Sequence, residues 1–189
     1  MLKTENNYDF KKELLIVHKP NIRDYNIIPL DDEIELKDGV IIHVCVEGEV
    51  AYTAIRDFED YLYMSMNICA VVSKADLPSR QRIVVKLGKN LGDADGYMGY
   101  RITTNSEEIS IEGYDERGIA QGLYYLEDIM NIRKAPYVKF GTIARKSLFT
   151  PRISQSPFGL NAYPDEAFKI LAHSGMDAIE LWIQDECTD

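Results

Sequence analysis

The segment from Phe149 to the C-terminus constrains the fold most, because it has the pattern strand, loop, helix, strand. Pro164 suits a first helical turn, and Gly175 suits the left-handed position after a helix. A helix is therefore predicted over about residues 164–174. The apolar run after it is typical of a parallel strand buried on both faces: Ala178, Ile179, Leu181, Trp182 and Ile183. We expect the opening of a parallel (β/α)8 barrel, present only as one βα unit and a second strand.

Residues 40–131 carry alternating strand and helix patterns. Strands are expected at 40–46, 70–72 and 82–87, and a hairpin over 100–111 turns at 104–106. One helix is indicated by apolar residues from Ala51 to Met66, and another is opened by Asp115 and extends to about Met130. Gly118 and Gly122 lower helix propensity, so they predict close packing of this helix against the sheet. The expected fold class is α+β, a mixed or antiparallel sheet with two helices on one face.

The parts on either side of this pattern are less regular. Short edge strands and loops are expected before residue 40, including a half-buried strand at 33–36. Residues 136–144 are predicted to form an extended connector. The expected domains are therefore an α/β domain over 1–145 and an incomplete barrel over 146–189.

The charge balance excludes one large class of partners. The chain has 21 Lys and Arg against 31 Asp and Glu, a formal charge of −10. Such a surface does not suit neutralisation of nucleic-acid phosphates or anionic lipid. No stretch approaches the roughly 20 apolar residues of a membrane span, and the apolar run Leu14–Val17 is too short for a signal peptide. We expect a protein that binds neither nucleic acid nor membranes and that is cytoplasmic, or secreted if a leader has been removed.

Neither a metal site nor a cofactor is predicted. The three cysteines lack CxxC spacing, and Cys45 and Cys69 lie in apolar runs, so buried free thiols are expected. The three histidines, which share no ligand spacing, are His18, His43 and His173. Asp93 and Asp95 resemble the start of a calcium loop but lack its terminal Glu, so residues 88–99 are predicted to be a connecting loop.

Several motifs occur together in an order that resembles a known family. The segment 99–113 is similar to the hairpin, and 115–123 to the following helix, of the family 20 glycoside hydrolases, the β-N-acetylhexosaminidases. The spacing of Phe149, Arg152 and Pro164 resembles that family's entry into its catalytic barrel. The resemblance covers the chain from about residue 28, and it implies the helper α/β domain that precedes that barrel.

The resemblance also implies roles for single residues. The guanidinium of Arg152 would bind two adjacent sugar hydroxyls, or else bridge a carboxylate between the two domains. Asp185 and Glu186 match an acidic pair after the second barrel strand, where they could contact substrate or simply be solvated. Residues 153–160 depart from the family's pattern, and the catalytic Asp-Glu pair of the family would follow the last residue given. The sequence therefore predicts no catalytic residue and no activity for this chain by itself.

Two functions remain open at this point. The chain could be the noncatalytic helper domain of a carbohydrate-active hydrolase, whose complete form binds carbohydrate. Its barrel segment would then expose apolar surface that self-association could cover. Alternatively, the chain could be a self-contained noncatalytic α/β module that binds a partner or a glycan.

Overall fold

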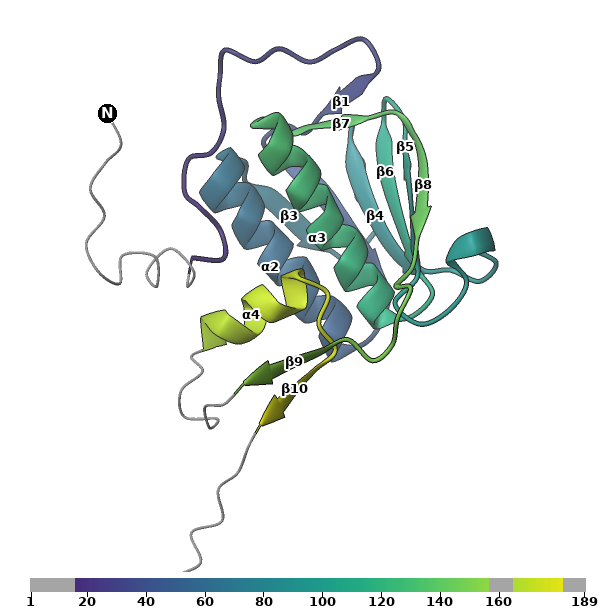
Figure 1. The fold of residues 1–189 in the computed structure, drawn as a ribbon. Coiled ribbons are helices and arrows are strands. Elements are labelled where there is room, and N and C mark those ends of the chain that lie inside the picture. Colours follow the sequence, from purple (N-terminus) through teal and green to yellow (C-terminus); the bar gives the residue numbers. More distant parts are fainter. Residues whose placement is uncertain (1–15, 157–164, 182–189) are drawn as a thin grey trace, which may run out of the picture. The chain divides into compact units, whose positions relative to one another are not determined.

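A computed structural model describes residues 16–156 and 165–181. These residues divide into two compact units, His18–Ser147 and a second unit that contains the described residues from Leu148 onward. Figure 1 labels the elements of both.

A six-stranded mixed sheet forms the centre of the first unit, with strand order β3-β2-β4-β6-β5-β8. Four neighbouring strands run parallel: β3 (Ala70–Ser73), β2 (Val40–Cys45), β4 (Arg82–Leu87) and β6 (Glu108–Gly113). Strand β5 (Tyr100–Thr104) pairs antiparallel with β6 and with the edge strand β8 (Gly141–Arg145). The predicted hairpin is therefore β5–β6, and the sheet is mixed rather than purely antiparallel.

Two helices cover one face of this sheet, as predicted (Figure 1). They are α2 (Glu49–Met66) and α3 (Glu116–Arg133). Side chains alternate along β5 and β6 between buried and partly exposed, so one face of each strand points into the core. The fully or almost fully buried residues of this core include Ile42, Ile83, Ile109 and Ile111 from the sheet and Ile55, Phe58, Leu62, Ile119, Leu123 and Met130 from the helices.

The two glycines of α3 mark its close approach to the sheet. A Cβ on Gly118 would lie 2.1 Å from the backbone oxygen of Gly99, and one on Gly122 would lie 2.9 Å from Cγ2 of Ile111. The first contact is with backbone, which cannot move easily, whereas the second is with the end of a side chain. The prediction of close packing at both glycines is confirmed.

Each helix begins at a carboxylate cap. The N-cap of α3 is Asp115, whose Oδ1 accepts a hydrogen bond from the N–H of Gly118 at 2.7 Å. The N-cap of α2 is Gly48, which has no side chain to do this. Instead Oε2 of Glu116, from the first turn of α3, accepts from the N–H groups of Val50 at 3.0 Å and Ala51 at 3.1 Å. One carboxylate thus caps α2 and joins the two helices.

Residues 136–144, predicted to form an extended connector, instead contribute to two sheets. They form two strands, because β7 (Tyr137–Lys139) pairs with β1 (Glu33–Glu35) in a small antiparallel sheet, and β8 closes the edge of the main sheet. The segment lacked the turn residues that usually separate two strands, and only Gly141, at φ 134°, marks the change of direction.

The predicted loop over 88–99 contains one short 3-10 turn, η1 (Gly92–Ala94). The thiols of Cys45 and Cys69 are free, as expected, but both residues are exposed rather than buried. Cys45 is the last residue of β2 and points away from the helices, and Cys69 lies in the connection between α2 and β3, just before Ala70. Cys187 lies outside the described residues.

The second unit contains the predicted strand, helix and strand. Strand β9 (Ile153–Ser156) pairs in parallel with β10 (Ala178–Leu181), and α4 (Asp165–His173) lies between them in sequence. None of the residues Ala178–Glu180 is buried, so the expected burial on both faces of this strand is not seen. Among the described residues, no helix is long and apolar enough to cross a membrane.

Candidate functional site

A polar cluster lies where the segment before β1 crosses the end of α2. The hydroxyl of Ser65 donates to the carbonyl oxygen of Lys19 at 2.8 Å, and the N–H of Asn21 donates to the carbonyl oxygen of Met64 at 2.9 Å. The N–H of Arg23 donates to the carbonyl of Ser65 at 3.1 Å. The bonds from Asn21 and Arg23 satisfy carbonyls in the last turn of α2, which a helix cannot satisfy internally. They also hold His18 against the helices.

The two helices each supply a buried carboxylate to this cluster. Asp57 of α2 is 7% exposed and Glu127 of α3 is 3% exposed. Both lie on helix faces that also carry apolar side chains, at helical spacing from Ala54 and Leu123. Burial of two acids in a helix pair is uncommon unless each acid has a partner.

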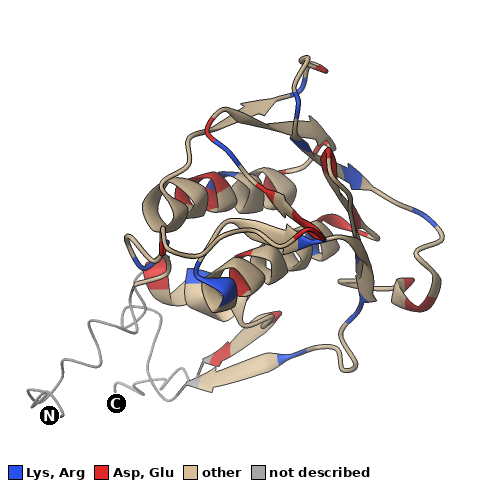
Figure 2. Ribbon diagram, turned by 90° about the horizontal axis from the view of Figure 1, so that it is seen from above, with Lys and Arg blue, Asp and Glu red and all other residues tan. Residues whose placement is uncertain are grey.

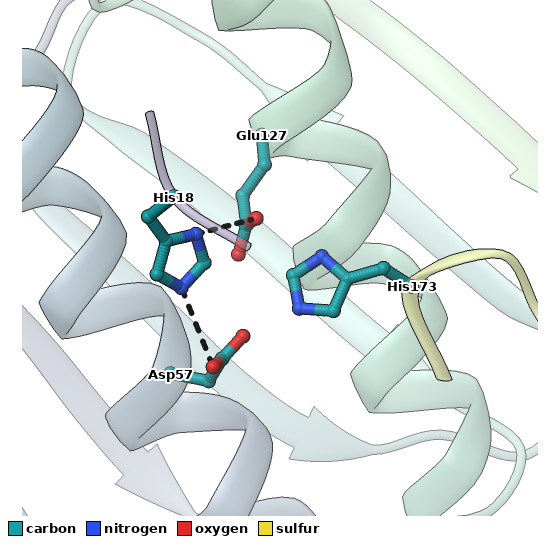
Figure 3. Close-up of side chains that lie close together, drawn as sticks. All are labelled: His18, Asp57, Glu127 and His173. Carbon is teal, nitrogen blue, oxygen red and sulfur yellow. Dashed lines mark ion pairs between the residues drawn. The ribbon is translucent and has the colours of Figure 1, made fainter. Parts of the chain in front are cut away.

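His18 lies between the two acids, with one ring nitrogen toward each (Figure 3). Its Nε2 is 3.3 Å from Oδ1 of Asp57, and its Nδ1 is 3.7 Å from Oε2 of Glu127. Tyr61 of α2 meets the imidazole edge-on, and its hydroxyl donates to the carbonyl oxygen of Glu127 and to Oδ1 of Asn131. Figure 3 also draws His173, which belongs to the second unit.

The electrostatics of the cluster favour an extra positive charge. Burial raises the pKa of Glu127 well above its ordinary value, and the negative charges of Asp57 and Asp128 raise it further. Burial, together with the charges of Asp57 and Glu127, also raises the pKa of Tyr124. A carboxyl group with these surroundings retains its proton unless a cation is close.

The sequence analysis missed this cluster, although a signal for it was present. Asp57 follows Ala54 by three residues and precedes Tyr61 by four, and Glu127 likewise follows Leu123 by four. Acidic residues on a stripe otherwise filled by buried side chains indicate a buried polar site. The role of His18 has no such signal, because it lies in an irregular segment and its partners are 39 and more residues away.

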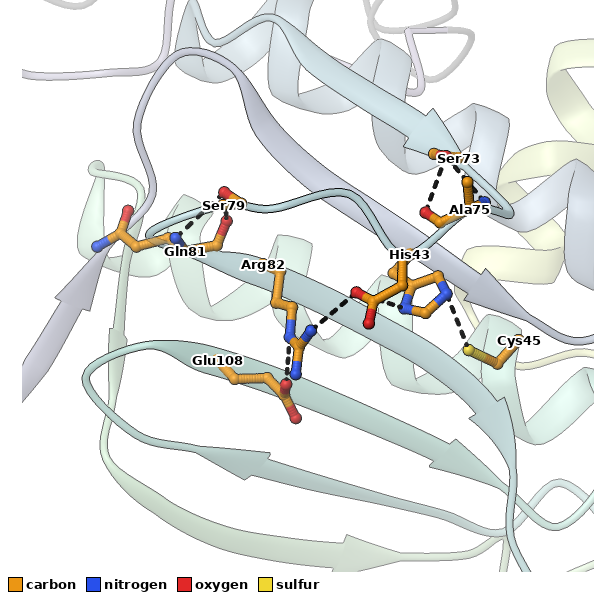
Figure 4. Close-up of polar contacts among 9 residues, drawn as sticks. His43, Cys45, Ser73, Ala75, Ser79, Gln81, Arg82 and Glu108 are labelled. Carbon is orange, nitrogen blue, oxygen red and sulfur yellow. Dashed lines mark hydrogen bonds and ion pairs between the residues drawn. The ribbon is translucent and has the colours of Figure 1, made fainter.

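The sheet face opposite the helices is also polar, but its charges are paired (Figure 4). Arg82 donates to Glu108 at 2.7 Å and to Asp76 at 3.1 Å, and Lys86 lies 3.2 Å from Glu112. Figure 2 shows acidic and basic residues interspersed along the ribbon. Exposed pairs of this kind contribute little to stability, because solvent screens their charges. The face has the character of a solvated surface.

Pockets lined by described residues of the first unit include three that lie away from the cluster. The largest, about 650 Å³, is polar and lies beside Arg80, Arg82 and Asn105. Another of about 490 Å³ is lined by Ile27, Ile129 and Ile132 and their neighbours, and a third of about 210 Å³ lies between α3 and β8. None of these three contains His18, Asp57 or Glu127.

Arg152, the residue predicted to contact sugar, lies immediately before β9. Its N–H donates to Oδ2 of Asp177 at 2.7 Å, and its Nη2 donates to the carbonyl oxygen of Ser174 at 2.9 Å, just after α4. This is the amino end of the strand, whereas barrel enzymes place their sites at the carboxyl ends. A sugar-binding role for Arg152 stays a prediction. Asp185 and Glu186, the other residues predicted to contact substrate, lie outside the described residues.

Comparison with known proteins shows the fold. No family model matches the sequence, and no curated protein matches it. Among solved structures, a mutant Streptomyces plicatus β-hexosaminidase in complex with GlcNAc is similar over 81% of this chain, with TM-score 0.65 and 17% identity. A GH20 exo-β-N-acetylglucosaminidase from Vibrio harveyi is similar over 92%, with TM-score 0.60 and 14% identity. A GH115 4-O-methyl-α-glucuronidase is similar over 80%, with TM-score 0.61 and 12% identity.

These matches cover most of this chain but only a third or less of each solved protein. This chain spans only 32% of the Streptomyces enzyme and 26% of each of the other two. The expected likeness to hexosaminidases is thus found at the level of fold, over most of this chain and about a third or less of theirs. A fold shared with a glucuronidase does not by itself fix the reaction. The chain has the mixed α+β fold of a portion of several glycoside hydrolases, hexosaminidases among them.

Proposed function

We propose that this chain is a noncatalytic part of a glycoside hydrolase, in which the unit His18–Ser147 supports a barrel that the residues from Leu148 begin. The observation that carries the proposal is the similarity to hexosaminidases and a glucuronidase over 80–92% of this chain. The order of the motifs along the sequence favours a family 20 enzyme as the complete protein. Hydrolysis of terminal N-acetylhexosamine glycosides would then be the reaction of the complete protein.

The exposure of apolar residues in the second unit supports this proposal. Leu148 and Phe149 are 87% and 76% exposed, and Ile153 and Phe168 are also exposed. Strands of a parallel barrel expect cover on both faces. Exposed apolar side chains around a two-stranded βαβ unit therefore fit a structure that further strands would complete.

The buried acids of the first unit do not provide an alternative catalytic pair. Glycosidases place two carboxyl groups on either side of a sugar in an open cleft. Asp57 and Glu127 instead face His18 and are almost completely buried. Their arrangement leaves no room for a sugar ring between them, which supports a noncatalytic first unit.

The coding sequence that follows Asp189 tests the proposal. We expect it to continue in frame through further βα units and to contain an adjacent Asp-Glu pair after a strand. A stop codon directly after Asp189 would contradict the proposal. In that case, binding of immobilised glycans by the chain would favour the alternative, a self-contained module.

A further inference from the structure

His18 faces a carboxylate oxygen with each ring nitrogen, and this fixes how many cations the cluster needs. A neutral imidazole carries a single proton, so one nitrogen would direct a lone pair at a carboxylate oxygen. The 3.3 Å contact with Asp57 and the 3.7 Å contact with Glu127 are both attractive only if a proton or a metal ion lies between the two atoms of each contact. Two protons can do this, on the ring or on Glu127, and the formal charges of these three side chains alone then sum to −1.

A divalent metal ion would satisfy the same contacts and cancel the charge. We propose that His18, Asp57 and Glu127 form a binding site for a divalent transition metal such as Zn²⁺. Nε2 of His18 and a carboxylate oxygen of Asp57 would be the metal ligands. Glu127 would accept a hydrogen bond from the Nδ1–H group of His18. This site goes beyond the proposed function and does not depend on it.

The distances fit such a site. Two ligands of a tetrahedral Zn²⁺, each about 2.1 Å from the ion, are about 3.4 Å apart. His18 Nε2 and Asp57 Oδ1 are 3.3 Å apart. One donor atom from each of the three residues lies within 4.8 Å of the others.

The position of Glu127 matches a recurring feature of metal sites. A metal-binding histidine commonly donates its second ring N–H to a carboxylate, which fixes the tautomer and orients the ring. Oε2 of Glu127 lies 3.7 Å from Nδ1 of His18, on the side where such a carboxylate would stand, although this distance is longer than a hydrogen bond. The ring is also held by its edge-on contact with Tyr61, so its orientation is set before a metal binds.

Ion entry and charge are also compatible with the site. The side chain of His18 is 10% exposed, so the cluster lies just beneath the surface rather than in the core behind α2 and α3. Mixed nitrogen and oxygen donors suit Zn²⁺ and its neighbours better than Ca²⁺ or Mg²⁺, which prefer oxygen donors alone.

The test uses the full chain, stripped of metal with a chelator and titrated with Zn²⁺ by calorimetry. We expect one Zn²⁺ per chain, with affinity that falls as the pH is lowered, because the ligands must be deprotonated to bind the metal. His18→Gln and Asp57→Asn should each weaken binding at least tenfold, and Glu127→Gln by about 10–100-fold. His43→Gln is the matched control, because His43 lies 3.5 Å from Cys45 on the opposite sheet face and offers a competing site.

Several results would overturn the proposal. These are absence of saturable binding, equal affinity in wild type and in the His18 and Asp57 variants, or loss of binding in the His43 variant alone. If the cluster variants do not fold, as judged by circular dichroism, X-ray absorption of the wild-type Zn²⁺ complex decides. Nitrogen and oxygen ligands without sulfur support the site, whereas a Zn–S distance near 2.3 Å places the ion at a cysteine and refutes it.

Discussion

Replacing Glu116 with alanine should destabilise the first unit by about 1–2 kcal/mol. The change removes a carboxylate that accepts two N–H groups in the first turn of α2, from Val50 and Ala51. Loss of a capping acceptor costs about 1 kcal/mol, and loss of a negative charge at a helix N-terminus costs about 0.3–1 kcal/mol. Water can partly replace the acceptor because Val50 is exposed, and this keeps the total below the sum of the upper limits.

Urea unfolding followed by circular dichroism measures this effect directly. Glu116→Gln retains an acceptor oxygen and should lose only about 0.3–1 kcal/mol. Glu49→Ala is a matched control, because Glu49 is another acid in the first turn of α2. A Glu116→Ala protein within about 0.3 kcal/mol of wild type, or no less stable than Glu49→Ala, would refute the capping argument.

Three further predictions follow from the packing of α2 and α3. Gly118→Ala should cost about 1–3 kcal/mol by overpacking against backbone and Gly122→Ala clearly less, so equal urea midpoints would contradict the close approach. Tyr61→Phe should cost about 1 kcal/mol by removing a buried hydroxyl, whereas Tyr63→Phe, at an exposed residue, should have no effect on the melting temperature. The pKa of Glu127 is raised in the folded protein, so its protonated form stabilises the fold below about pH 4.3, and this stability is lost as the pH rises through the raised pKa. Metal-free Glu127→Gln should therefore lose less stability than the metal-free wild type over that pH range. Parallel pH profiles of the two proteins would contradict this.

Elements with regular spacing could be predicted from the sequence because each pattern is local. The bounds predicted for β4 agree with the structure, and α2 and α3 begin and end within a few residues of their predicted limits. The predicted helix over 164–174 corresponds to α4, which is Asp165–His173. In each case the apolar period or a capping residue determines the element.

Pairings between distant parts of the chain could not be predicted in the same way. β7 was missed because its partner β1 is over a hundred residues away, and no local pattern specifies that contact. The exposure of Cys45 could not be predicted because the apolar sequence of β2 does not indicate which face of the strand the helices cover. The His18 cluster could not be predicted because its three residues come from parts of the chain that are far apart in sequence. Only the two acids, Asp57 and Glu127, stand out in the helical pattern.

Hydrolysis of 4-nitrophenyl N-acetyl-β-D-glucosaminide tests the central claim most directly. The chain described here should show no turnover above a protein-free blank. The protein extended through the coding sequence after Asp189 should release 4-nitrophenol. Turnover by this chain alone would contradict the noncatalytic assignment, and an extended, folded protein inactive on this substrate and on a panel of other chromogenic glycosides would contradict the assignment to a glycoside hydrolase.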